Sequence, residues 1–243
     1  MTRRMRWKGS YGHERIGSAR TASGPLVTVA PLAEPKKPAT WKVAGVTIVG
    51  FVVLLYLIEA YDYFLDNQAL DQDGIRPLEV DGLWGVLWAP VLHGGWDHLY
   101  ANTVPALVLG FLVGLTGLGR FLGATAIIWV LGGLGTWVIG NWGAPAGVET
   151  VHVGASGLIM GWLTFLIVFG FFTRQVWQIV VGIIVFFAYG SVLLGVFPGT
   201  LGVSWQGHLS GALAGIVAAY VLSGPERKSR ALRRAVTPPR LAA

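Results

Sequence analysis

Six apolar stretches of about 20 residues, each without a charge in its central part, constrain the fold of this chain most strongly. About 20 residues is the length of helix that crosses the ~30 Å hydrocarbon core of a bilayer. The composition agrees, because 53% of the 243 residues are apolar and only 12% are charged, about half the charged fraction of a typical soluble domain. We therefore predict an all-α polytopic membrane protein, a six-transmembrane helix bundle with the spans Trp41–Tyr63, His98–Leu118, Phe121–Gly140, Val153–Phe172, Val176–Val196 and Leu201–Leu222.

The charges outside the spans predict the orientation and the domain organisation. Basic residues dominate residues 1–40 and the residues after Leu222, and Arg120 and Arg174 mark two connections. The connection between the first two spans is acidic instead. Since cytoplasmic segments carry the excess of Lys and Arg, both termini are predicted in the cytoplasm of a plasma membrane. We expect a flexible basic tail at 1–40, the six-span domain at 41–223 and a second basic tail at 224–243.

The tails and the composition exclude several other classes. The arginines at the start are followed by a polar stretch, which is not the pattern of a signal peptide. Cysteine is absent, so disulfides, thiol nucleophiles and thiolate metal sites are excluded. The net charge of +6 is explained by membrane topology and indicates no nucleic-acid partner.

Two polar residues lie within these apolar stretches. Ser156 belongs to the sequence Val-Gly-Ala-Ser-Gly, and His208 to Gln-Gly-His-Leu-Ser-Gly. A hydroxyl or an imidazole buried in lipid without a partner costs on the order of a few kcal/mol, so we expect the two to bond each other. The predicted orientation places both near the outer face. They are either a catalytic serine–histidine pair or two polar groups that satisfy each other.

Small residues predict that the helices carrying this pair touch. The glycines lie three and four residues apart, which puts them on one helix face and lets membrane helices approach closely; they are Gly154, Gly157 and Gly161 near the serine, and Gly211 and Gly215 after the histidine. Such stripes also serve helix packing with no active site attached.

A third cluster surrounds the start of the second span. His98 and Asn102 are four residues apart and share a helix face. Their side chains can donate to the negative oxygen that develops in acyl transfer. The alternative is an interfacial histidine and an asparagine that bonds across helices.

Together these residues resemble the rhomboid family of intramembrane serine proteases. The resemblance covers about residues 41–222, including a rhomboid-like arrangement of spans, and rests on three motifs: His93…His98…Asn102, Gly154-Ala-Ser156-Gly157 and Gly207-His208…Gly211…Gly215. It implies a Ser–His dyad that cleaves transmembrane segments of single-pass or multi-pass membrane proteins near the outer face, with Ser156 as nucleophile and His208 as general base. No metal and no cofactor are implied, and the pattern specifies no oligomeric state.

The resemblance also assigns the residues around the dyad. Asn102, His98 and the backbone N–H of Ser156 would form the oxyanion hole, Gly154 would keep its approach clear, and His93 would support the structure. One position departs from the family: Trp84 matches a family tryptophan, but Gly85 stands where an arginine is usual. We expect this change to affect the packing of the outer loop more than activity.

Other residues and other functions stay open at this point. His152 is either an outer-loop residue or one that tunes the base, whereas Ser210 is a helix-packing serine, since residues two apart on a helix do not face each other. His93, His98 and His208 lack the carboxylate or motif of a zinc site. The alternative functions are a non-proteolytic rhomboid-like protein that binds or escorts transmembrane segments, and a small transporter, which would more naturally carry acidic residues within its spans.

Overall fold

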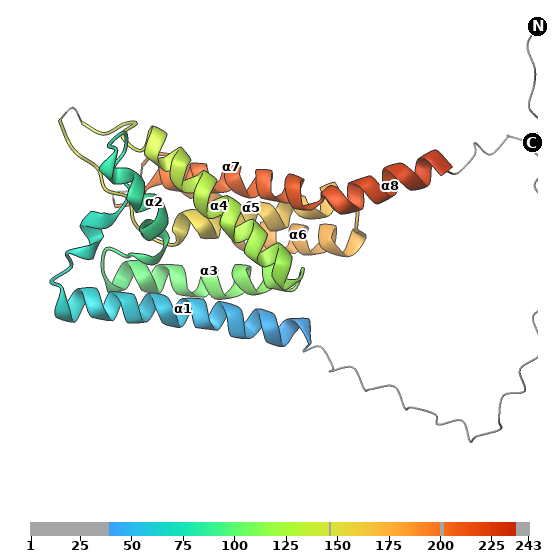
Figure 1. Ribbon diagram of the computed structural model, residues 1–243, viewed down its shortest axis with the longest axis horizontal. Helices are drawn as coiled ribbons and strands as arrows, with labels where there is room; N and C mark the ends of the chain where they lie inside the picture. Colours follow the sequence, from blue (N-terminus) through green and yellow to red (C-terminus); the bar gives the residue numbers. More distant parts are fainter. Residues whose placement is uncertain (1–38, 146, 200–201, 237–243) are drawn as a thin grey trace, which may run out of the picture. The chain divides into compact units, whose positions relative to one another are not determined.

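The computed structural model describes residues 39–145, 147–199 and 202–236, and Figure 1 shows these as a bundle of helices. Most of the predicted N-terminal tail, with residues 237–243 of the C-terminal one and Leu201 of the sixth predicted span, lies outside the described residues. The all-α fold is confirmed, and the described part has only one isolated β-bridge, between Ile75 and His152.

Six long helices occupy the positions of the six predicted spans. They are α1 (Thr40–Leu65), α3 (Trp96–Gly114), α4 (Leu118–Ile139), α5 (Ser156–Thr173), α6 (Val176–Tyr189), continued by the 3₁₀ helix η4 (Gly190–Val196), and α7 (Trp205–Leu222). The connection from α1 to α3 holds the short helices η1 (Leu70–Asp73), η2 (Asp81–Trp84), α2 (Gly85–Trp88) and η3 (Ala89–Val91).

By length and apolarity alone, not all six helices qualify as spans. Four of the described helices are long and apolar enough, namely α1, α4, α5 and α6 with η4; a fifth qualifies if α7 is joined to the helix that follows it. The helix α3 is not among them, since its first turns hold Asp97, His98 and Asn102. Two of these residues, His98 and Asn102, are ones that the sequence predicts to be functional.

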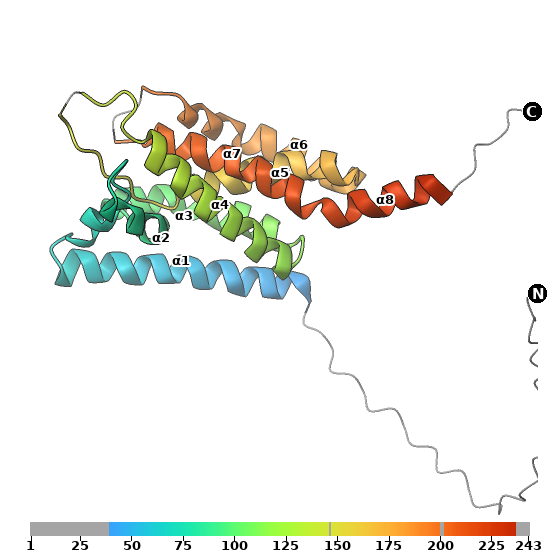
Figure 2. The same ribbon diagram turned by 45° about the horizontal axis from the view of Figure 1, so that its top comes forward.

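The helix α5 forms the centre of the bundle. Of its most apolar 18 residues 67% are buried, against 28% for α1 and 11% for α6 with η4. Trp162, Phe165 and Phe169 are its largest fully buried side chains. The outer helices instead expose apolar side chains such as Phe187 of α6, which suits contact with lipid. Figure 2 shows α5 enclosed by α4, α6 and α7.

Glycines bring α5 and α7 into backbone contact, as their spacing predicts. A methyl group added to Gly211 would collide with the carbonyl oxygen of Gly157, and one added to Gly215 with that of Gly161. In the other direction, a Cβ at Gly157 would lie 3.1 Å from the carbonyl oxygen of Gly207. This close approach fixes the height of α7 against α5.

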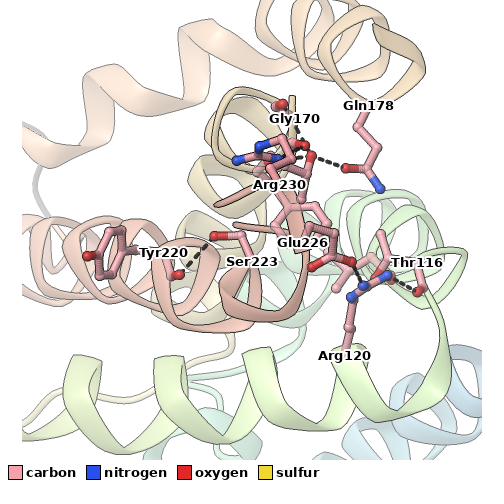
Figure 3. Close-up of polar contacts among 11 residues, drawn as sticks. Thr116, Arg120, Gly170, Gln178, Tyr220, Ser223, Glu226 and Arg230 are labelled. Carbon is pink, nitrogen blue, oxygen red and sulfur yellow. Dashed lines mark hydrogen bonds and ion pairs between the residues drawn. The ribbon is translucent and has the colours of Figure 1, made fainter. Parts of the chain in front are cut away.

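Residues 224–236 differ from the expected flexible tail, because they form the helix α8 (Gly224–Val236), which is rich in Arg and Ala and has Glu226 in its first turn. Figure 3 shows how it is held: Glu226 pairs with Arg120 of α4, and Arg230 reaches the last carbonyls of α5. Its bend relative to α7 is 41°. These contacts order α8 at the end of the bundle where α5 ends.

Candidate active site

The functional residues predicted from the sequence meet at one end of the bundle. Figure 1 shows that α3, α5 and α7 all begin there, opposite α8. Between these helix starts lies a cavity of about 770 Å³ that is lined by His98, Asn102, Ser156 and His208. One cavity therefore contains the nucleophile, the base and both side-chain oxyanion donors predicted from the sequence.

Ser156 is the first residue of α5. The first N–H groups of an α-helix have no partner inside the helix, and the positive end of the helix dipole lies there. Ser156 also lines a second, small cavity of about 50 Å³ on the side of α4. Ser156 therefore borders both cavities.

His208 lies one turn into α7 and is held by a backbone group. Its Nδ1 lies 3.1 Å from the carbonyl oxygen of Gly195. Because a carbonyl oxygen can only accept, Nδ1 carries the hydrogen and Nε2 of the neutral ring has a free lone pair. The hydrogen bonds of the described residues do not include the expected one between Ser156 and His208; in sites without substrate such bonds are often long.

Gly195 is a residue of the candidate site that the sequence analysis missed. A Cβ at this position would lie 2.7 Å from Nδ1 of His208 and 3.2 Å from Cε of Met160. Only glycine therefore lets the backbone of η4 come close enough to hold the imidazole. The available signal was weak, since it was one glycine among 35 in the chain.

His98 has the complementary arrangement. Its Nδ1 accepts a hydrogen bond from the backbone N–H of Gly94 at 3.3 Å, so the neutral ring carries its hydrogen on Nε2. This Nε2–H lies against Gly154, where a Cβ would be 2.7 Å away. Gly154 has φ +114°, which also favours glycine. The amide of Asn102 donates one hydrogen to the carbonyl oxygen of His98 at 3.0 Å and has a second to offer.

His93 contacts the residue just before α5. It is 1% exposed, and its Nε2 accepts from the N–H of Ala155 at 3.4 Å. Burial lowers the pKa of His93 to about 3, so the ring is neutral. Its ring lies edge-on to that of His98, with 5.2 Å between centroids. This placement agrees with a structural role.

His152 and Gly85 both pack in connections between the long helices. His152 is 8% exposed and bonds to Ser204 Oγ at 2.7 Å, at the start of α7. Around Gly85, an added Cβ would collide with the carbonyl group of Gly74 and the nitrogen of Ile75. The close backbone contact therefore takes the place where an arginine side chain would begin, which explains the departure at this position.

The remaining predicted residues have separate places. Ser210 is buried against α4, where a Cβ on Gly135 would lie 2.9 Å from its Oγ. Among the described residues, no group of three or more His, Asp or Glu side chains could hold a metal ion.

Comparison with known proteins agrees with this geometry. Residues 80–225 match the family model of the rhomboid domain. An uncharacterized protein of Mycobacterium tuberculosis is 59% identical over 222 residues, 87% of this chain and 92% of its own length. An uncharacterized protein of Mycobacterium leprae is 57% identical over 210 residues, 85% of this chain and 82% of its own.

A more distant relative has a name that states an activity. Rhomboid-like protease 5 of Toxoplasma gondii is 31% identical over 155 residues, 61% of this chain and 17% of that protein. The matched rhomboid domain contains all three motifs, from His93 to Gly215. With the helical membrane fold and the cavity between α3, α5 and α7, this match shows that the chain belongs to the rhomboid family.

Proposed function

We propose that the chain is an intramembrane serine endopeptidase that cleaves transmembrane segments of membrane proteins. The observation that carries the proposal is the single cavity of about 770 Å³ lined by Ser156, His208, His98 and Asn102. A binding or escorting protein needs neither a serine nor a histidine here, and both Ser156 and His208 line this cavity. The name of the Toxoplasma relative supports the same activity.

The dyad works through the free Nε2 of His208. As Ser156 Oγ attacks the carbonyl carbon of the substrate, Nε2 takes the hydroxyl proton, and the bond from Nδ1–H to the Gly195 carbonyl holds the ring in this tautomer. When the C–N bond breaks, the imidazolium returns the proton to the leaving amine. A water molecule then attacks the acyl group, His208 takes its proton, and Ser156 leaves with that proton.

Three donors stabilise the negative oxygen of the tetrahedral intermediate. They are Nε2–H of His98, the second amide hydrogen of Asn102 and the backbone N–H of Ser156. Each preorganised donor of this kind contributes on the order of 3 kcal/mol in the transition state. Asn102→Ala should therefore lower kcat by roughly 10- to 1000-fold.

The rest of the lining suits an apolar peptide. Much of it is apolar and includes Pro105, Trp142, Met160, Val192 and Val203, whereas Thr150, His152, Ser204 and Gln206 add polar groups. A helical substrate must unwind locally before its carbonyl reaches Ser156, because helical hydrogen bonds hide that carbonyl. The basic α8 lies at the opposite end of the bundle, which supports a cavity open to the outside of a plasma membrane and a cytoplasmic C-terminus.

A serine-reactive fluorophosphonate probe tests the proposal on the purified full-length protein. We expect Ser156 of the wild type to be labelled, no labelling after Ser156→Ala, and strongly slowed labelling after His208→Ala. Ser210→Ala is the matched control, since this serine lies on α7 two residues after His208 but packs against α4, and it should be labelled like the wild type. Cleavage of single-span substrates in liposomes, with product masses, then locates the scissile bond. A wild type that neither labels nor cleaves would favour a binding or escorting function.

A further inference from the structure

His152 lies at the junction of the segments that carry the two halves of the dyad. It is four residues before Ser156 in the chain, and its ring faces Ser204, four residues before His208. Its backbone pairs with Ile75, in the connection from α1 to α3, in both directions, at 2.9 and 3.0 Å. Both ring nitrogens have partners, although the residue is 8% exposed.

The donor and the acceptor of each hydrogen bond around the His152 ring can be assigned in turn. Asn141 turns its Nδ2 to the carbonyl of Pro77, so its Oδ1 accepts from the hydroxyl of Thr150 at 2.8 Å. Thr150 has then used its only hydrogen, and it accepts from Nε2–H of His152 at 3.1 Å. The neutral ring therefore has a free lone pair on Nδ1. Burial lowers the pKa of His152, which agrees with a neutral ring.

Ser204 connects the His152 ring to the first turn of α7. Ser204 donates its hydroxyl hydrogen to Nδ1 of His152 at 2.7 Å. Its oxygen accepts from the backbone N–H of Gly207 at 3.0 Å, as the N-cap of α7. The carbonyl oxygen of Ser204 accepts from the N–H of His208, also at 3.0 Å. The first turn of α7 is therefore fixed by a serine whose own hydroxyl is fixed by His152.

We propose that His152 is a positioning residue for His208, acting through Ser204 to hold the first turn of α7 where Nε2 of His208 faces the cavity. The effect on the rate of cleavage rests on the proposed protease function. The effect of His152 on the position of the His208 ring does not depend on that function. A misplacement of about 1 Å can cost about 100-fold in rate. Loss of the His152–Ser204 bond should therefore lower kcat by about 10- to 100-fold with KM nearly unchanged.

Two substitutions of His152 distinguish the role of Nδ1 from that of Nε2. His152→Asn places Oδ1 near the position of Nδ1 and keeps an acceptor for Ser204. His152→Gln places its amide near the position of Nε2 and loses that acceptor. The matched control is Thr164→Val, which removes another buried bond between α5 and α7, from Thr164 Oγ1 to the carbonyl of Ala212 at 2.7 Å.

The first measurement does not need activity. In full-length protein labelled with ¹⁵N-histidine, the five histidines of the chain give few signals, and we expect the Nδ1–H tautomer for His208 and the Nε2–H tautomer for His152. His152→Gln and Ser204→Ala should both shift the His208 ring signals, whereas Thr164→Val should not. Unshifted His208 signals in both variants would overturn the proposal, even if the wild type proved inactive.

The second measurement is cleavage in liposomes, with the melting temperature of each variant. His152→Gln should lose kcat, His152→Asn should recover most of it, and the double variant His152→Gln/Ser204→Ala should be no slower than the slower single variant. If His152→Gln had the kcat of the wild type and only a lower melting temperature, His152 would have a purely structural role. This result would overturn the claim that His152 positions His208 for cleavage.

Discussion

A single methyl group at Gly195 should separate catalysis from stability. In Gly195→Ala the added Cβ would lie 2.7 Å from Nδ1 of His208. Gly195 is not among the described glycines with positive φ, so alanine fits the backbone of η4 without strain. The perturbation therefore acts on the His208 ring, with a smaller contact to the flexible end of Met160 at 3.2 Å.

The expected magnitude follows from these distances. Ordinary van der Waals contact begins at 3.4 Å, so the ring must move by about 0.7 Å, and a displacement near 1 Å costs up to about 100-fold in rate. Loss of the Nδ1–H bond costs about 0.5–1.5 kcal/mol of stability. Replacing glycine by alanine at a compatible position stabilises the folded protein by about 0.4–1 kcal/mol. We expect kcat to fall by about 10- to 100-fold while the melting temperature changes little.

The assay is cleavage of a single-span substrate in liposomes, together with the rate of fluorophosphonate labelling. The matched control is Gly190→Ala, also in η4, where the added Cβ would lie 3.4 Å from the ring of Phe186, an ordinary contact. This control should keep the wild-type rate. If Gly195→Ala cleaves as fast as Gly190→Ala, the Gly195 carbonyl does not orient the base and our account of the dyad is wrong.

Three further predictions concern stability, each measured by thermal unfolding in detergent. Arg230→Ala removes the donors to the last carbonyls of α5 and should cost about 1–2 kcal/mol without slowing labelling; an unchanged melting temperature would show that these bonds do not stabilise the protein. His93 stays neutral in the folded state down to a pKa of about 3, so stability should be full above pH 6.5 and fall by up to about 1.4 kcal/mol per pH unit below it. His93→Gln keeps an acceptor for the N–H of Ala155 and should reduce that slope, and an identical slope would exclude His93 as its source. Gly85→Arg, which restores the usual family residue, should destabilise the protein because the Gly74 carbonyl lies in its way, and equal stability would refute this.

The helices and the meeting of the motifs were predictable, because both depend on local patterns. Apolar stretches of span length locate α1 and α4 to α7, and glycines three and four residues apart locate the contact of Gly157 and Gly161 with α7. The ordered helix α8 was not predicted. Its basic residues suggested a solvated tail, whereas the contacts of Arg230 and Glu226 with other helices depend on the tertiary fold.

The polar contacts that hold the site were not predictable for a related reason. The partner of Ser204 is 52 positions away in the chain, at His152. The sequence left a role of His152 in tuning the base open, but it gave no sign that this residue pairs with Ser204. The departure at Gly85 could be seen in the sequence, but its explanation needed the position of the Gly74 backbone. Sequence patterns report which face of a helix is buried, but they do not report which loop backbone lies against it.

The means by which His208 is oriented follows from the membrane environment. In a soluble triad a carboxylate bonds Nδ1–H of the histidine and stabilises the imidazolium, but a charged group within a span is expensive. Here a neutral carbonyl, that of Gly195, accepts from Nδ1–H at 3.1 Å. It fixes the tautomer and the ring orientation without burying a charge. It stabilises the imidazolium less than a carboxylate would, so the rate depends more on the position of the ring. A site of this kind therefore needs glycine at 195 and a firmly held start of α7, and both are features of this chain.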